Sequence, residues 1–213
     1  MARRTKEEAE QTRNDILDAA EQMFFERGVA RTTLEEIARA AGVTRGAVYW
    51  HFHNKVDLFD AMQARARLPQ EDVIECLLSR ETDRPLEHLA CTLKDILQVM
   101  ATDLRRQRVF TILFHRCEYV EEMRTVAQRK QDRTDQMLDR LIRFFELMAQ
   151  RGELSPHWPP ASAALGMHAL MVGLLNRMLD GDNPESLVTM AQECVTAFFT
   201  SLAGRAPAME NPA

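Results

Sequence analysis

Residues 32–55 read TTLEEIARAAGVTRGAVYWHFHNK, and this stretch contains the signals that decide the fold. Thr32 followed three residues later by Glu35 is a capping box, and the apolar residues after it predict a two-turn helix that ends at Gly42. Gly42 can adopt a positive φ in a sharp turn, and Thr44 can cap the next short helix. Two short helices joined by such a turn predict a helix-turn-helix.

The second of these helices, expected over residues 45–51, has two opposed faces. At 100° per residue, Val48 and Phe52 lie within about 40° of each other and define the face that the helix must bury. Trp50 lies roughly 180° from the centre of that face, and Tyr49 lies on its flank. The pattern therefore predicts that Phe52 enters the core while Tyr49 and Trp50 point outward; the alternative is that Trp50 packs on a neighbouring helix.

An outward face of aromatic and hydrogen-bonding side chains with small residues between them suits the major groove of DNA. The residues expected on this face are Arg45, Gly46, Tyr49, Trp50 and His51. Arg45 can bond a guanine edge, Trp50 can meet a thymine methyl group or a sugar, and a glycine keeps the backbone close. Lys55 begins the next helix, which Asn54 caps, and there its charge can combine with free amide groups to hold a phosphate. The alternative for Lys55 is an ordinary solvated side chain.

The rest of the chain also reads as helices. Thr5 and Glu8 form a capping box for a first helix that Gly28 ends, and amphipathic or apolar patterns continue to residue 202 with no strand-like alternation. We therefore predict an all-α fold of about nine helices. The expected parts are a three-helix, helix-turn-helix DNA-binding domain over residues 1–55, a larger helical domain over 56–204, and a frayed tail over 205–213.

Composition and charge limit the possible partners and location. The net charge of −5 disfavours phosphate binding on average, but residues 1–55 carry nine basic and nine acidic side chains, whereas the remainder carries 18 and 23. Several bases of the first segment gather around the predicted recognition helix and in an arm formed by Arg3, Arg4 and Lys6. The apolar run over residues 163–175 is shorter than the roughly 20 residues of a membrane helix. We expect a cytoplasmic protein that does not enter a membrane.

The sequence offers no catalytic or metal-binding signature. Its four cysteines contain no CxxC pair, which predicts reduced thiols without a zinc site or a disulfide framework. No nucleophile with a base, carboxylate pair or phosphate loop stands out. We therefore expect neither an enzyme nor a bound cofactor.

The stretch TTLEEIARAAGVTRGAVYWHFHNK resembles the DNA-binding segment of the TetR/AcrR family of one-component repressors. MARRTKEEAEQTRNDILDAAE at residues 1–21 and ILFHRCEYVEEM at 112–123 resemble the branch that represses multidrug efflux pumps. The resemblance implies DNA-facing roles for Thr33, Arg45, Tyr49, Trp50, His51 and Lys55; the predicted DNA-binding set adds Thr44 and Gly46. It also implies that the larger domain over residues 56–204 is the ligand-binding and dimerisation domain. A further implication is a homodimer on a palindromic operator, released when a hydrophobic small molecule binds that domain. The alternatives are a metabolic regulator with another effector and a ligand-binding module without an operator.

The second half of the chain carries the patterns expected of a dimer and of a ligand pocket. Residues 163–175 are apolar nearly all round, which predicts burial on two sides, one of them against a second copy that Gly166 and Gly173 allow to come close. Facing helices supply apolar and a few polar side chains for a pocket, although each of these residues can equally belong to an ordinary core. The candidates are Leu93, Ile96, Leu97, Met100, Phe110, Phe114, Met137, Leu141, Phe144, Met167, His168, Met171, Leu174, Asn176 and Arg177.

Overall fold

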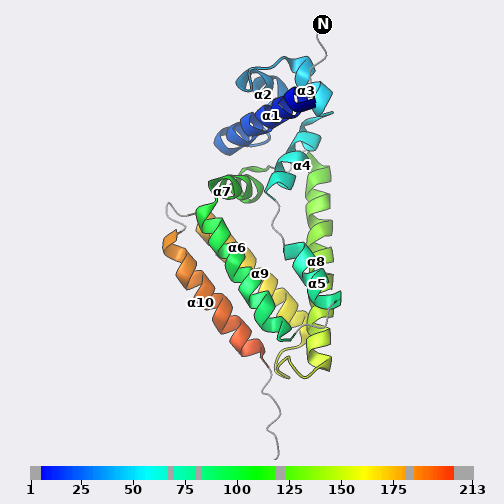
Figure 1. Cartoon of the computed structure of the whole chain (residues 1–213), viewed down its shortest axis with the longest axis vertical. Helices are drawn as coiled ribbons and strands as arrows, with labels where there is room; N and C mark the ends of the chain where they lie inside the picture. The colour runs from blue at the N-terminus through cyan, green and yellow to red at the C-terminus, as the bar shows by residue number, and fades with distance from the viewer. Residues whose placement is uncertain (1–5, 67–69, 80–82, 119–122, 181–184, 204–213) are drawn as a thin grey trace, which may run out of the picture. The chain divides into compact units, whose positions relative to one another are not determined.

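The computed structural model describes residues 6–66, 70–79, 83–118, 123–180 and 185–203, and within them every regular element is a helix (Figure 1). This confirms the all-α prediction. Turns and loops join the helices, and Leu154 and Ala203 form an isolated β-bridge. The elements are α1 (Lys6–Arg27), α2 (Leu34–Ala40), α3 (Arg45–His51), α4 (Lys55–Arg65), α5 (Gln70–Ser79), α6 (Pro85–Thr102), α7 (Leu104–Thr111), the π-helix η1 (Ile112–Arg116), α8 (Arg124–Gln150), α9 (Pro160–Leu179) and α10 (Glu185–Leu202). One helix not predicted separately is α5, which follows Pro69, a residue type that ends helices.

The chain forms two compact units, each of which is described by itself. The first unit comprises residues 1–67 and 104–130, and the second comprises residues 68–103 and 131–213. Within the first unit, α1 contacts α2, α3, α4, α7 and η1. The first unit therefore contains more than the three helices of a helix-turn-helix domain, and the domain boundary at residue 55 stays a prediction.

The core of the first unit holds α3 in place. Phe24 of α1 and Phe59 of α4 are fully buried, with their ring centroids 6.1 Å apart. Ile37 of α2, Val48 of α3 and Phe52 are buried in the same cluster. Each fully buried side chain of this size stabilises the fold by about 1.5–3 kcal/mol, so the helix-turn-helix is held by apolar packing from α1 and α4.

The capping box of α2 lies one residue later than predicted. Thr33 accepts a hydrogen bond from the backbone N–H of Glu36, and the Glu36 carboxylate accepts one from the backbone N–H of Thr33 at 2.9 Å. The bonds from Thr33 lower the pKa of Glu36. Thr32 is instead fully buried, and its hydroxyl donates to the Gly28 carbonyl at 2.9 Å. The prediction that Thr32 caps the helix was wrong because that hydroxyl is used inside the first unit.

Gly42 makes the turn between α2 and α3 with φ +67°, as predicted from its position. We expect Gly42→Ala to lower the free energy of unfolding by about 1 kcal/mol, because a side chain disfavours this conformation. A Cβ there would meet no atom within 4 Å, so the conformation is the only source of the loss. The loss can be measured by urea denaturation.

Gly46→Ala is the matched control, because Gly46 lies inside α3 and its added Cβ would meet only Thr44 Oγ1, at 3.9 Å. It should leave stability unchanged or raise it by up to about 1 kcal/mol. Equal stability of the two variants would contradict the assigned role of Gly42.

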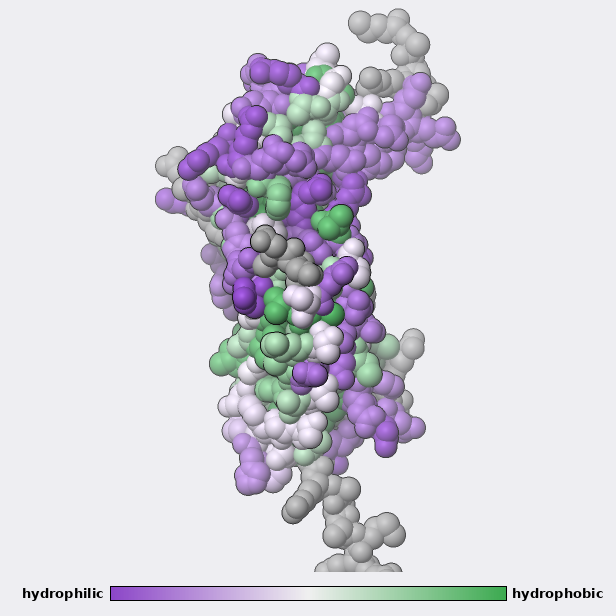
Figure 2. Space-filling model, turned by 90° about the vertical axis from the view of Figure 1, so that its left-hand side faces the viewer, coloured by the Kyte–Doolittle hydropathy of each residue, from purple (hydrophilic) through white to green (hydrophobic). Residues whose placement is uncertain are grey.

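The second unit is a bundle in which α6 contacts α5, α9 and α10. Its buried residues include Leu97 of α6, Phe144 of α8, and Val195 of α10. In Figure 2, which turns the side of α10 toward the viewer, hydrophobic and near-neutral residues gather over this unit. Large apolar side chains also remain exposed on these helices, namely Leu165 and Val172 of α9 and Met190 of α10.

Candidate nucleic-acid interface

The helix α3 has the two opposed faces that its sequence predicts. Val48 is fully buried and Phe52 is 1% exposed, whereas Tyr49 is 45% exposed and Trp50 is 73% exposed. The Trp50 ring contacts the His51 ring edge to face, with centroids 4.5 Å apart. The predicted burial is therefore confirmed, and the alternative that Trp50 packs on a neighbouring helix is wrong.

The first exposed pair on α3 is Arg45 and Tyr49, one turn apart on the same face. The Arg45 guanidinium lies 5.4 Å from the centre of the Tyr49 ring, and its Nη2 donates to the Tyr49 hydroxyl at 3.5 Å. This hydrogen bond raises the pKa of Arg45, so the group stays charged. A guanidinium held over a ring is positioned before any partner arrives, which reduces the ordering cost of binding.

Two exposed threonines stand at the beginnings of α2 and α3. Thr44 Oγ1 accepts from the backbone N–H of Ala47 at 3.2 Å, and Thr33 caps α2 in the same manner. Both hydroxyl oxygens thus already accept a hydrogen bond from a backbone N–H in the first turn of a helix. Thr44 can still donate its proton to a phosphate oxygen, because a hydroxyl both donates and accepts. The Thr33 hydroxyl already donates its proton to the Glu36 carboxylate at 2.8 Å.

Lys55 is engaged inside the protein at the start of α4. Its Nζ donates to the Thr32 carbonyl at 3.2 Å, and the side chain is half-buried. Asn54 caps α4 as predicted by accepting from the Asp57 N–H at 2.8 Å, and the Asp57 carboxylate accepts from the His53 N–H at 3.0 Å. Lys55 therefore ties α4 to the segment before α2, and its contact with phosphate stays a prediction.

An open surface hollow of about 690 Å³ brings several predicted residues together within the first unit. Four of them line it: Thr33, Arg45, Tyr49 and Lys55. The other lining residues are Leu34, Glu35, His53, Asn54, Val56, Thr125 and Arg129. Sequence reasoning missed the last two, which belong to α8, because no local motif marks residues that join a site through tertiary packing. Trp50 and His51 do not line this hollow.

The residues predicted to bind a small molecule fall into both units. Within the second unit, eight of them are buried: Leu93, Ile96, Leu97, Met100, Leu141, Phe144, Met167 and Met171. Met137, His168, Leu174 and Asn176 are half-buried, and Arg177 is exposed. Burial lowers the pKa of His168, which favours its neutral form. Phe110 and Phe114 belong to the first unit, where their rings stack with centroids 6.2 Å apart.

Metal and membrane signals are absent from the part of the chain that the structure describes. Within those ranges, no group of three or more His, Cys, Asp or Glu side chains is arranged to hold a metal ion. None of the helices there is long and apolar enough to cross a membrane. The four cysteines are free thiols.

Comparisons with known proteins agree with this geometry. The family model of bacterial regulatory proteins, tetR family, matches residues 16–62, and the model of the MAATS-type transcriptional repressor C-terminal region matches residues 84–203. The transcriptional repressor BepR of Brucella suis is 42% identical over 97% of this chain and 98% of its own. The crystal structure of NalD of Pseudomonas aeruginosa is 38% identical, with a TM-score of 0.80 over 94% of this chain and 100% of its own. A complex of SmeT with triclosan is 30% identical, with a TM-score of 0.76 over 95% of this chain and 100% of that one. The chain belongs to the TetR family of bacterial regulatory proteins, with a C-terminal region of the MAATS-type transcriptional repressors.

Proposed function

We propose that this protein is a cytoplasmic transcriptional repressor that binds a palindromic operator as a homodimer and is released by hydrophobic compounds. The observation that carries the proposal is α3, whose Arg45, Tyr49 and Trp50 are exposed while Val48 and Phe52 fix the opposite face in the core. Only an anchored helix can present side chains to base edges in a fixed orientation. The outward face is the part that contacts the operator.

The regulated genes are proposed to encode a multidrug efflux pump. NalD is the secondary repressor of the MexAB-OprM multidrug efflux pump, and SmeT is the repressor of the SmeDEF multidrug efflux pump of Stenotrophomonas maltophilia. The SmeT complex with triclosan supports a hydrophobic effector class. The effector acts by binding better to a dimer whose recognition helices are wrongly spaced, so its differential affinity sets how much repressor leaves the DNA.

The second unit offers the surface for the homodimer. Leu165 and Val172 of α9 are seven residues apart, on the same side of the helix, and both are exposed, as is Met190 of α10. Gly173 also faces open space, whereas an added Cβ at Gly166 would lie 3.3 Å from Phe198 of the same chain. Gly166 thus allows α9 to pack against α10 of the same chain, and we assign only Gly173 to the proposed dimer contact. Dimerisation brings two recognition helices to the spacing of about 34 Å that successive major grooves require.

Leu165→Glu should shift the protein toward monomers, because it places a charge in the proposed interface. We expect the dimer dissociation constant to rise by about 10-fold or more, as measured by analytical ultracentrifugation. Arg151→Leu removes one charge at an exposed position before α9 and should leave the constant unchanged. A wild-type protein that is monomeric at micromolar concentration would contradict the proposed assembly.

The function is tested by an electrophoretic mobility assay with the DNA upstream of the protein's own gene. At low salt we expect a shifted complex, which triclosan or another lipophilic compound dissolves. Failure to bind this DNA would overturn the repressor proposal and favour a ligand-binding module without an operator. Binding that lipophilic compounds do not affect would overturn the effector class and favour a metabolic regulator.

A further inference from the structure

The chain passes between its two units three times, and an arginine of the first unit stands near each passage. The units divide after residue 67, after residue 103 and after residue 130. Arg65 lies two residues before the first division, Arg105 two residues after the second, and Arg129 one residue before the third. Each of these guanidiniums pairs with a carboxylate of α1 or α4.

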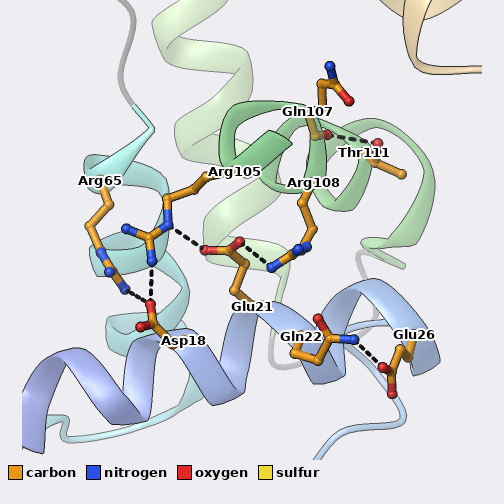
Figure 3. A network of polar contacts seen from close by, with 9 residues as sticks. All are labelled: Asp18, Glu21, Gln22, Glu26, Arg65, Arg105, Gln107, Arg108 and Thr111. Carbon is orange, nitrogen blue, oxygen red and sulfur yellow. Dashed lines mark hydrogen bonds and ion pairs between the residues drawn. The ribbon is translucent and has the colours of Figure 1, made fainter. Parts of the chain in front are cut away.

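Asp18 of α1 joins the first two passages through one oxygen atom. Its Oδ1 lies 2.8 Å from Nη1 of Arg65, in the last turn of α4, and 2.6 Å from Nη2 of Arg105, in the first turn of α7 (Figure 3). Arg65 Nη1 is buried, and among the described residues it has no hydrogen bond of good angular geometry beside this ion pair. The contact with Asp18 is thus the ionic anchor of the end of α4.

Glu21, one turn further along α1, strengthens the anchor of α7. This carboxylate is only 2% exposed; it accepts from Arg108 Nη1 at 3.0 Å and lies 3.5 Å from Arg105 Nε (Figure 3). Burial raises the pKa of Glu21, while the charges of Arg105 and Arg108 oppose that rise. A buried carboxylate depends on its partners, so separating α7 from α1 leaves a charge uncompensated.

We propose that this arginine–carboxylate network is the junction through which the state of the second unit changes the position of α1, and with it the DNA-binding helices. The inference rests on the proposed function and adds the residues that regulate it. A displacement of the chain at the first passage moves α4, and one at the second passage moves α7. Arg65 of α4 and Arg105 of α7 both pair with Asp18 of α1. Because α1 also contacts α2 and α3, its movement alters the presentation of α3. The third passage has its own link, since Arg129 of α8 pairs with Asp60 of α4.

Linkage makes this proposal testable without a known effector, because coupling between two parts of a molecule is reciprocal. If ligand in the second unit alters DNA binding, then DNA bound to the first unit must alter the second. We therefore compare hydrogen exchange in α6 and α9, with and without saturating operator duplex from the upstream region. In the wild-type protein we expect the duplex to change exchange rates there by about fivefold or more.

The variants Asp18→Asn and Glu21→Gln remove one carboxylate charge each with little change in shape. Asp18 is 52% exposed, so the first variant is expected to fold. Both variants should bind the duplex within about threefold of wild-type affinity. The change in hydrogen-exchange rate that the duplex causes in α6 and α9 should nevertheless fall below about twofold. Matched controls on the same helix are Asp15→Asn and Glu26→Gln, whose exposed carboxylates accept from Gln11 and Gln22 outside the network. The controls should behave like wild type.

Two results would overturn the proposed role of the network. One is that the duplex changes hydrogen-exchange rates in α6 and α9 as much in both charge variants as in the wild-type protein. The other is a wild-type protein that binds the duplex without any change in the second unit. If the wild-type protein binds no duplex at all, the repressor proposal itself fails and the junction fails with it, which the mobility assay shows separately.

Discussion

Tyr49→Ala should reduce operator affinity on the order of 100-fold, since it removes two contributions at once. The first is the proposed contact of the half-exposed ring and hydroxyl with DNA. The second is the placement of Arg45, whose guanidinium lies over the Tyr49 ring and donates to its hydroxyl. Fluorescence anisotropy with a labelled operator duplex at fixed salt gives the dissociation constant directly.

Tyr49→Phe separates the two contributions, because it keeps the ring beneath Arg45 and removes only the hydroxyl. It should cost less affinity than Tyr49→Ala. Neither variant should lower the free energy of unfolding by more than about 1 kcal/mol, since the side chain lies outside the core. An Ala variant that binds the operator as tightly as wild type would show that the outward face of α3 does not contact DNA.

Phe52→Ala should lower the free energy of unfolding by about 3–5 kcal/mol, the largest stability effect we expect in the first unit. Phe52 is 1% exposed and closes α3 onto the core that Phe24 and Phe59 build. Its loss leaves a cavity and removes apolar area from the face of α3 that packs on the core. Denaturant unfolding followed by circular dichroism measures the change.

Trp50→Ala is the control for that experiment, because it truncates a larger ring only two residues away. At 73% exposure, Trp50 should contribute less than about 1 kcal/mol to stability. Trp50→Ala should nonetheless weaken operator binding, because it removes a side chain of the outward face. Phe52→Ala should weaken binding for a different reason, namely that less of the protein is folded. Comparable stability losses in the two variants would contradict the opposed faces of α3.

Short-range patterns predicted the parts of the fold that short-range physics decides. The alternation of Val48 and Phe52 with Tyr49 and Trp50 follows from helical periodicity alone, and the structure confirms it. The position of Gly42 likewise follows from the turn that it must make. Local rules were ambiguous at α2, because both Thr32 and Thr33 precede a glutamate by three residues. Burial of Thr32 decided between them, and burial is not a local property.

Long-range contacts lay beyond the sequence patterns. Asp18 and Arg105 are 87 residues apart, as are Glu21 and Arg108, and neither pair belongs to a motif. Arg129 joins the hollow beside Tyr49 only because α8 begins within the first unit. The candidate ligand residues were chosen for apolar character, which core residues share, so their roles stay predictions.

The most direct test of the central proposal is a hydroxyl-radical footprint of the wild-type protein on the DNA upstream of its own gene. We expect two protected tracts with related, inverted sequences, whose centres lie about 10–10.5 base pairs apart or a multiple of that spacing, because a dimer presents two copies of α3 to successive major grooves. Protection should be lost in the Tyr49→Ala variant at the same protein concentration. An unprotected fragment, or a footprint that Tyr49→Ala reproduces, would contradict the assignment of α3 as the recognition helix of a repressor.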